Sequence, residues 1–134
     1  MKGLNDRLVS CQRAISTLDE ILQMEVSAIV RDASIQRFEY SFESLWKLLK
    51  AYLDQCEGIV CNSPKRCFRE ALKVRLLSVQ EAETCLIMTD DRNLTSHTYI
   101  EAVAEAIYGK LPSYLNVMNV LLANIRVCIE QVTF

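Results

Sequence analysis

Glycine and proline are scarce in this chain of 134 residues, which has three glycines and two prolines. Sandwiches and barrels need both residues in their many turns, so the scarcity argues against those folds. Antiparallel helices need few turns, and an all-α bundle is therefore the expected fold class. The length fits one domain with a sizeable core, so we expect residues 1–134 to form a single helical domain.

Long apolar runs are also missing, because no stretch reaches the roughly 18 uninterrupted apolar residues that a membrane-spanning helix needs. The segment from Met1 to Arg7 has no apolar core after Lys2, which argues against a signal peptide. The sequence therefore predicts a cytoplasmic protein with no membrane partner. The formal net charge is −2, so contact with nucleic acid would need a local basic patch.

The chain has one histidine and, among six cysteines, no Cys-x-x-Cys pair, so a zinc site would need an unusual set of ligands. We expect neither a metal nor a cofactor. A disulfide framework is disfavoured because a core of this size can hold the fold, and buried free thiols are expected instead. No glycine-rich phosphate loop or nucleophile elbow is present, which argues against a stand-alone nucleotide-hydrolysing or acyl-transfer enzyme.

Apolar residues recur every three or four positions along most of the chain, which predicts an up-and-down antiparallel bundle of four to five helices. One stripe runs from Leu4 to Leu22, and a second runs from Ile35 to Tyr52 before Gly58 ends that helix. Ser63-Pro64 is typical of a helix start.

Two capping boxes, each a serine or threonine followed three residues later by glutamate, indicate further helix starts. Ser78 is expected to open a helix toward Asp90, and Thr98 to open another with the next residue as its first. Gly109 and Pro112 are expected to separate that helix from the last one.

The last predicted helix carries two apolar rows. They are Leu115, Met118, Leu122, Ile125, Ile129 and Val132, and Val117, Val120, Leu121, Val127 and Cys128. One face of a bundle helix cannot bury both rows, so this helix is either buried all round or forms a dimer interface.

The candidate site lies in the polar segment that contains the only histidine, His97, five residues after Arg92. On a straight helix the two side chains would lie about 140° apart, so they share a face only if the helix breaks between them. A new start at Thr98 would place His97 beside a helix N-terminus, which attracts phosphate. The planar guanidinium of Arg92 suits phosphate too, whereas a lone histidine is otherwise a common capping or packing residue.

A basic row follows Pro64. Lys65, Arg69 and Lys73 recur every four residues and so share one helix face. The row is either a solvated face or a strip that follows the phosphates of RNA.

Residues 92–97, Arg-Asn-Leu-Thr-Ser-His, resemble the Arg-x4-6-His motif of the HEPN superfamily. With Thr98 and Tyr99 the motif becomes Arg-x4-His-x-Tyr, the form found in HepT-type toxins that are paired with minimal nucleotidyltransferases. Residues 35–47 and 63–71 are similar to the second and third helices of bacterial nucleotidyltransferase substrate-binding proteins. The resemblance implies a helical bundle that dimerises and a partner nucleotidyltransferase.

The resemblance also implies roles for single residues. Arg92 and His97 would be catalytic, with Asn93 in support, and Tyr99 would accept AMP from the partner enzyme. Independently of the resemblance, the adjacent acids Asp90 and Asp91 either orient Arg92, with Asp91 as a supporting residue, or are merely solvated. Metal-independent cleavage of RNA needs one group to take the 2′-hydroxyl proton and another to protonate the leaving 5′-oxygen. Because one chain owns one histidine, a two-fold homodimer would bring two imidazoles to a shared cleft.

Three hypotheses follow. The chain is the HEPN partner of a minimal nucleotidyltransferase, acting as a toxin or as a substrate-presenting subunit. Alternatively, it is an active endoribonuclease in which Arg92 stabilises the phosphorane charge and His97 is the acid or base. The third hypothesis is a structural bundle without a site. For Tyr99 itself, the alternative to accepting AMP is that its ring packs at a helix start.

Overall fold

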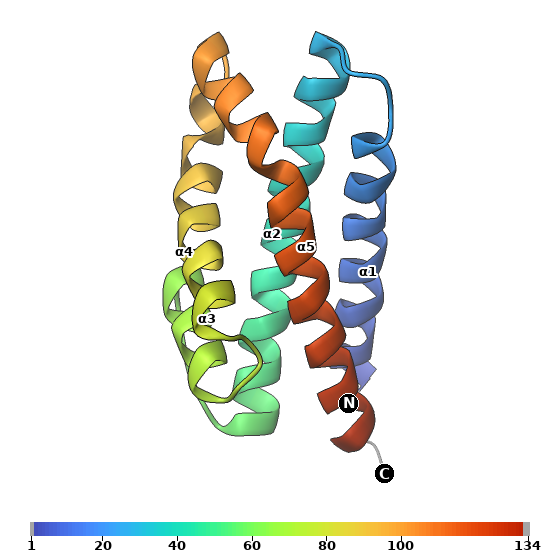
Figure 1. Ribbon diagram of the computed structural model, residues 1–134. Helices are drawn as coiled ribbons and strands as arrows, with labels where there is room; N and C mark the ends of the chain where they lie inside the picture. Colours follow the sequence, from blue (N-terminus) through green and yellow to red (C-terminus); the bar gives the residue numbers. More distant parts are fainter. Residues whose placement is uncertain (1, 133–134) are drawn as a thin grey trace.

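The computed structural model describes residues 2–132, and every regular element in that range is helical (Figure 1). The helices are α1 (Lys2–Leu22), α2 (Ala28–Glu57), α3 (Pro64–Lys73), α4 (Val79–Leu94) and α5 (Glu101–Val132), with the short 3-10 helix η1 (Thr95–His97) before α5. The prediction of an all-α bundle is confirmed.

The four long helices, α1, α2, α4 and α5, alternate in direction, as an up-and-down bundle requires (Figure 1). The short α3 belongs to the connection from α2 to α4 and packs against both of them. Helix α5 crosses the front of the bundle and contacts α1, α2 and α4. The segment that carries the candidate site therefore lies at one end of the bundle, where the chain passes from α4 to α5.

Aliphatic and aromatic side chains from the five helices form one continuous core. Three phenylalanines are fully buried within it, and they join α2 to its neighbours. The ring of Phe38 lies 5.7 Å from that of Tyr114 on α5, and the ring of Phe42 lies 6.0 Å from that of Phe68 on α3. These contacts fix the outer helices against α2, which is the central element of the fold.

Serine side chains cap helices where the sequence predicts them. The hydroxyl of Ser63 accepts a hydrogen bond from the backbone of Arg66, with Pro64 in the first turn of α3. Ser78 and Glu81 form the complete capping box at the start of α4. Both predicted starts are confirmed, because such caps depend only on residues three positions apart.

Helix α5 does not stop at Gly109 or Pro112, so the predicted separation of two helices is wrong. The helix is continuous for 32 residues, with Pro112 inside it. Gly109 and Pro112 are both exposed. Leu111, which lies between them, and Tyr114, which follows Pro112, are buried. Proline removes one helical hydrogen bond, and the burial of neighbouring side chains against the core offsets that loss.

The predicted start at Thr98 is also wrong, because α5 begins at Glu101. The helix α4 does end near Leu94, but η1 follows, and Thr98 has helical dihedral angles of −72° and −6° rather than an extended cap conformation. Its hydroxyl donates to the carbonyl of Thr95 at 3.2 Å instead of accepting from the next helix. Threonine hydroxyls that bond backward in this way cannot cap forward.

The two apolar rows of α5 differ in burial. The first row is buried from Leu115 to Ile129, and the side chain of Val132 lies outside the described residues. In the second row Leu121 is fully buried, whereas Val120 and Val127 are 37% and 46% exposed. Helix α5 is thus buried on more than one face but not all round.

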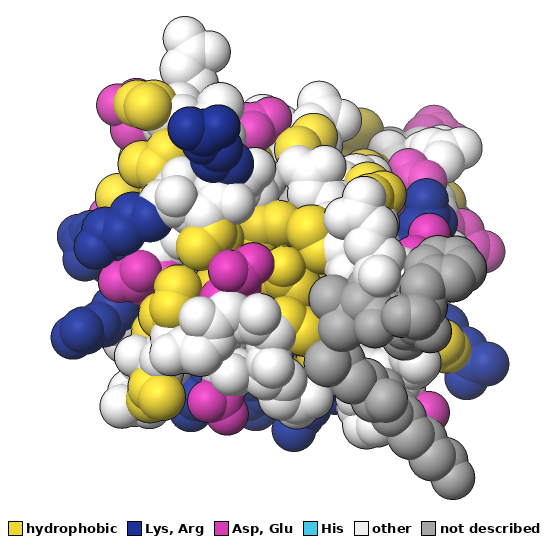
Figure 2. All heavy atoms as spheres, turned by 90° about the horizontal axis from the view of Figure 1, so that it is seen from below, with side chains coloured by type: hydrophobic (Ala, Val, Ile, Leu, Met, Phe, Trp, Pro, Cys, Tyr) yellow, Lys and Arg dark blue, Asp and Glu magenta, His cyan; other side chains and the backbone are white. Residues whose placement is uncertain are grey.

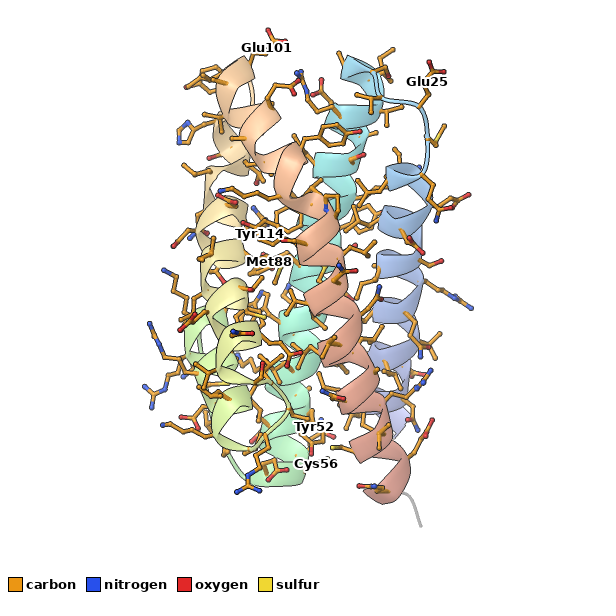
Figure 3. The ribbon with its side chains drawn as sticks, in the orientation of Figure 1. Glu25, Tyr52, Cys56, Met88, Glu101 and Tyr114 are labelled. Atoms are coloured by element: carbon orange, nitrogen blue, oxygen red, sulfur yellow. A yellow bond between two sulfur atoms is a disulfide. The ribbon has the colours of Figure 1, made fainter. Side chains whose placement is uncertain are left out.

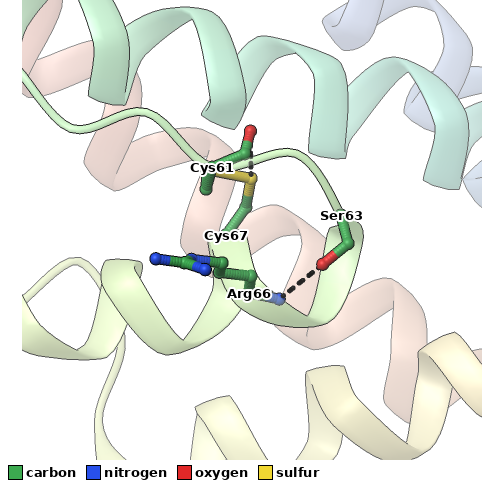
Figure 4. Close-up of a disulfide and its surroundings, with 4 residues drawn as sticks. All are labelled: Cys61, Ser63, Arg66 and Cys67. Carbon is green, nitrogen blue, oxygen red and sulfur yellow. Dashed lines mark hydrogen bonds between the residues drawn. A yellow bond between two sulfur atoms is a disulfide. The ribbon is translucent and has the colours of Figure 1, made fainter.

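Cys61 and Cys67 form a disulfide, which corrects the expectation that the cysteines are buried free thiols (Figure 4). The chain after Gly58 returns along the bundle, and this places the Cα atom of Cys61 5.5 Å from that of Cys67 in the first turns of α3. Cys11 and Cys85 are buried thiols, as expected, and burial raises the pKa of each from 9.0 to about 12.

The end of the bundle at which α2 and α5 finish has hydrophobic side chains in the middle of its surface (Figure 2). Tyr52 and Cys56 lie near this end (Figure 3). The hydroxyl of Tyr52, a buried residue, donates to Glu57 at 2.9 Å, and desolvation is the largest cause of the raised pKa of Tyr52. Within residues 2–132, no helix has the length and hydropathy that a membrane span requires.

Candidate functional site

Arg92 lies in the last turn of α4 and extends across to α2, where two glutamates meet it. Its Nη2 is 3.4 Å from Oε1 of Glu43, and its Nη1 is 3.9 Å from Oε2 of Glu39. The same Nη1 donates to the hydroxyl of Thr95 at 3.1 Å. These contacts orient the guanidinium before any ligand arrives, and the two carboxylates oppose its positive charge.

The Nε of Arg92 is buried and has no hydrogen-bond partner among the described residues. The guanidinium lines one side of a surface pocket whose other walls include Glu39, Tyr40 and Glu43 on α2. A phosphate that binds here must compete with the glutamates, so the arrangement suits a ligand that brings further contacts of its own.

The segment that joins α4 to α5 lies at the upper end of the bundle in Figure 1, and it contains His97 and Tyr99. Their rings meet edge to face with centroids 6.0 Å apart. His97 is exposed, and Tyr99 is 81% exposed, so the ring of Tyr99 does not pack at a helix start, which was the alternative interpretation of this residue. Tyr99 lies in the turn before α5 rather than in its first turn.

Asp91 does not orient Arg92, which corrects the role predicted for it. Its carboxylate is buried on the other side of α4, where it accepts hydrogen bonds from the hydroxyl of Tyr114 and, at 3.2 Å, from Lys110. Burial and Asp91 raise the pKa of Tyr114. Asp91 therefore joins α4 to α5, and Asn93, the other predicted supporting residue, is exposed.

The neighbouring Asp90 pairs with Lys65 at 2.6 Å, so the two adjacent acids have different partners. Within residues 2–132, no group of three or more histidine, cysteine, aspartate or glutamate side chains is arranged to hold a metal ion. Asp90 and Asp91 thus serve contacts between helices.

The basic row on α3 is partly engaged in ion pairs. Lys65 pairs with Asp90, and Lys73 pairs with Glu70 at 3.3 Å. Arg69 is exposed. Two of the three cations predicted to contact phosphate would therefore have to exchange a carboxylate for it.

Arg31 positions the site, although no sequence pattern indicates it, because its partners are about 70 residues away. The side chain is buried at the start of α2 and lies 2.6 Å from Glu105 and 3.4 Å from Glu101 in the first turns of α5. Hydrogen bonds to Glu105 and Asp32 raise the pKa of Arg31. Arg31 thereby ties the start of α5, and with it the Tyr99 turn, to α2.

Known proteins resemble this chain in sequence and in fold. Residues 6–127 match the family described as nucleotidyltransferase substrate binding protein like. A Haemophilus influenzae protein described as a probable ribonuclease HepT is 32% identical over 107 residues, which are 74% of this chain and 72% of that protein.

Two solved structures share the fold. A Thermus thermophilus protein has a TM-score of 0.84 and 47% identity, over 87% of this chain and 98% of that one. A Haemophilus influenzae protein, described as having the fold of a substrate-binding domain of a nucleotidyltransferase, has a TM-score of 0.66 and 26% identity, over 93% of this chain and 98% of that one. The chain therefore belongs to the family of HepT-type nucleotidyltransferase substrate-binding proteins.

Proposed function

We propose that this chain, as a single HEPN-like domain over residues 1–134, is the toxin subunit paired with a minimal nucleotidyltransferase, which transfers AMP to Tyr99. The family match and the structural neighbour described as a substrate-binding domain support the partnership. The observation that carries the role of Tyr99 is its exposure of 81%, which leaves the phenol open to a second protein. Both ATP and RNA are cytoplasmic, so we place the pair in the cytoplasm.

The proposed transfer is a displacement at the α-phosphorus of ATP held with magnesium by the partner. The phenol oxygen of Tyr99 forms a bond to that phosphorus, the bond to the β-phosphate oxygen breaks, and pyrophosphate leaves. A phenol is a weak nucleophile until a base takes its proton. The imidazole of His97, with its ring 6.0 Å from that of Tyr99, is the candidate base on this chain.

Transfer of AMP to Tyr99 would change the electrostatics of the site by adding a negative charge. An AMP group on Tyr99 would place a phosphodiester beside His97 and on the same end of the bundle as Arg92. That fixed negative charge would repel an RNA phosphate and occupy its place. Transfer of AMP would therefore silence the toxin.

The activity to be silenced is, in this proposal, metal-independent cleavage of RNA by Arg92 and His97. The relative described as a probable ribonuclease HepT favours it. Arg92 would stabilise charge on the phosphorane, and His97 would move a proton. Because the chain has one histidine, we propose a two-fold homodimer with a shared cleft, and the half-exposed Val120 and Val127 on α5 are candidates for its interface. The basic row at Lys65, Arg69 and Lys73 would then contact RNA.

Co-expression tests the partnership. The nucleotidyltransferase encoded beside this chain is expected to co-purify with it through gel filtration, and an unrelated nucleotidyltransferase of similar size is the control. Light scattering of the chain alone at micromolar concentration is expected to give twice the monomer mass. Failure to co-purify contradicts the partnership, and a monomer contradicts the shared cleft.

A further inference from the structure

A second pocket lies between α1 and the C-terminal half of α2, away from the Tyr99 turn. Its volume is about 560 Å³, within the range of small-molecule sites. Arg7 on α1 and Trp46, Lys47, Lys50 and Asp54 on α2 line it.

The far wall of this pocket is the loop that follows α2, and the disulfide holds that loop in place. Cys61 belongs to the wall, and its bond to Cys67 ties the loop to the first turns of α3 (Figure 4). The pocket is therefore bounded by two packed helices and a cross-linked loop rather than by a free segment. Such a preformed site does not have to order itself when a ligand binds.

The ring of Trp46 is half-buried and packs against the hydrophobic core. Its indole N–H donates to Oε2 of Glu43 at 3.1 Å, which fixes the orientation of the ring. The Nζ of Lys50 lies 5.9 Å from the ring centroid. A flat base can stack on such an oriented ring when the flexible side chain of Lys50, which lies over the ring, turns toward a phosphate.

Positive charge predominates in the pocket, although the whole chain has a net charge of −2. Among the residues that line it, the three cations Arg7, Lys47 and Lys50 outnumber the one carboxylate, that of Asp54. Lys47 is only loosely paired, with its Nζ 3.9 Å from Glu43. Three cations around an aromatic ring suit a ligand that combines an anionic group with a flat ring. A purely anionic ligand would leave the aromatic ring unused, and a purely apolar ligand would leave the cations unpaired.

We propose that this pocket binds a nucleotide unit, with the base stacked on Trp46 and the phosphate held by Arg7, Lys47 and Lys50. The unit is either a free nucleotide or one residue of a single-stranded RNA. Glu43 connects the pocket with the first site, because one of its oxygens accepts from Trp46 and the other lies 3.4 Å from Arg92. An RNA strand along the outer side of α2 would thus meet both places.

Trp46 is the only tryptophan in the chain, so its fluorescence reports on this pocket alone. We expect saturable quenching when the protein is titrated at low salt with AMP or with a short single-stranded oligoribonucleotide. Adenosine, which lacks the phosphate, is expected to bind at least tenfold more weakly than AMP. Quenching by AMP alone identifies a free nucleotide as the ligand, and quenching by the oligonucleotide alone identifies RNA.

Single substitutions distinguish specific binding in this pocket from nonspecific electrostatic attraction to surface cations. Arg7→Gln and Lys50→Gln are each expected to weaken binding about tenfold, which equals about 1.4 kcal/mol. Arg13→Gln, which removes another exposed arginine of α1 outside the pocket, is the matched control and is expected to change nothing. Equal weakening by all three variants, or no quenching by either ligand, overturns the proposal. Tyr99→Phe is expected to leave the quenching intact, so failure of AMP transfer and failure of this pocket are distinguishable.

Discussion

Glu43 on α2 holds Arg92 on α4 with one carboxylate oxygen, at 3.4 Å, and the indole of Trp46 with the other, at 3.1 Å. The guanidinium is consequently oriented and partly neutralised in the free protein. The same carboxylate couples it to the pocket beside α1.

Weakening that ion pair is expected to favour phosphate. Glu43→Gln keeps an oxygen for Trp46 but removes one of the two charges that compete for Arg92, so binding of RNA is expected to strengthen several-fold. The cost in folding stability is expected to stay near 1 kcal/mol, because the pair is partly solvated. Filter binding of a labelled single-stranded RNA measures the affinity, with Glu20→Gln, which removes an exposed glutamate of α1, as the control for lost surface charge. Weaker binding by Glu43→Gln would contradict a phosphate role for Arg92.

The proposed cleavage of RNA is expected to stop in both His97→Ala and Arg92→Ala, while the circular dichroism spectrum of each variant remains that of the helical bundle. A chelator is expected to have no effect, since the proposed mechanism uses only protein groups. Arg13→Ala serves as the control. Cleavage that survives His97→Ala, or that chelator abolishes, would rule out the mechanism.

The two adjacent acids of α4 are expected to differ in their effect on stability. Asp91→Asn weakens a buried hydrogen bond from Tyr114 and a partly buried one from Lys110, and we expect the free energy of unfolding to fall by about 2 kcal/mol. Asp90→Asn removes a surface ion pair with Lys65 and is expected to cost less than about 1 kcal/mol. Urea unfolding of both variants gives the comparison, and equal losses would show that Asp91 is not a structural anchor.

Alkaline pH is expected to destabilise the bundle through its buried thiols. Burial raises the pKa of Cys85 from 9.0 to about 12, so the folded state keeps its proton where the unfolded chain has lost it. This contribution is fully present below pH 9 and declines as the pH rises from 9 toward 12. Between pH 8 and pH 10 each such thiol is expected to cost about 1 kcal/mol. The variant Cys85→Ala, measured by urea unfolding at both pH values, is expected to lose less stability over this interval than the parent chain, and an identical loss would contradict the assignment.

Local signals in the sequence predicted the helices well. The starts at Ser63 and Ser78 could be predicted because a cap needs only a side-chain oxygen and a backbone N–H three residues later. Thr98 has the same local pattern, but its hydroxyl bonds backward to Thr95, and no pattern distinguishes the two uses. Pro112 looked like a boundary because its effect on a helix is local, whereas the burial that keeps α5 continuous comes from distant helices.

The sequence alone could not predict which residues from distant parts of the chain contact the site. The motif from Arg92 to His97 could be recognised, but Glu43 lies on another helix, and nothing in the motif indicates that a carboxylate opposes the arginine. The Cys61–Cys67 disulfide likewise depends on the path of a loop. The residue types in the sequence indicate which side chains could react, whereas only the fold determines which of these side chains lie in contact.

The most direct test of the account is the intact mass of this chain after incubation with its proposed partner nucleotidyltransferase, ATP and magnesium. We expect a gain of one or more AMP units on the parent chain and on Tyr40→Phe, a control that removes a tyrosine 42% exposed whose hydroxyl bonds Thr17. Tyr99→Phe is expected to gain none. No gain on the parent chain, or an equal gain on Tyr99→Phe, would contradict the account.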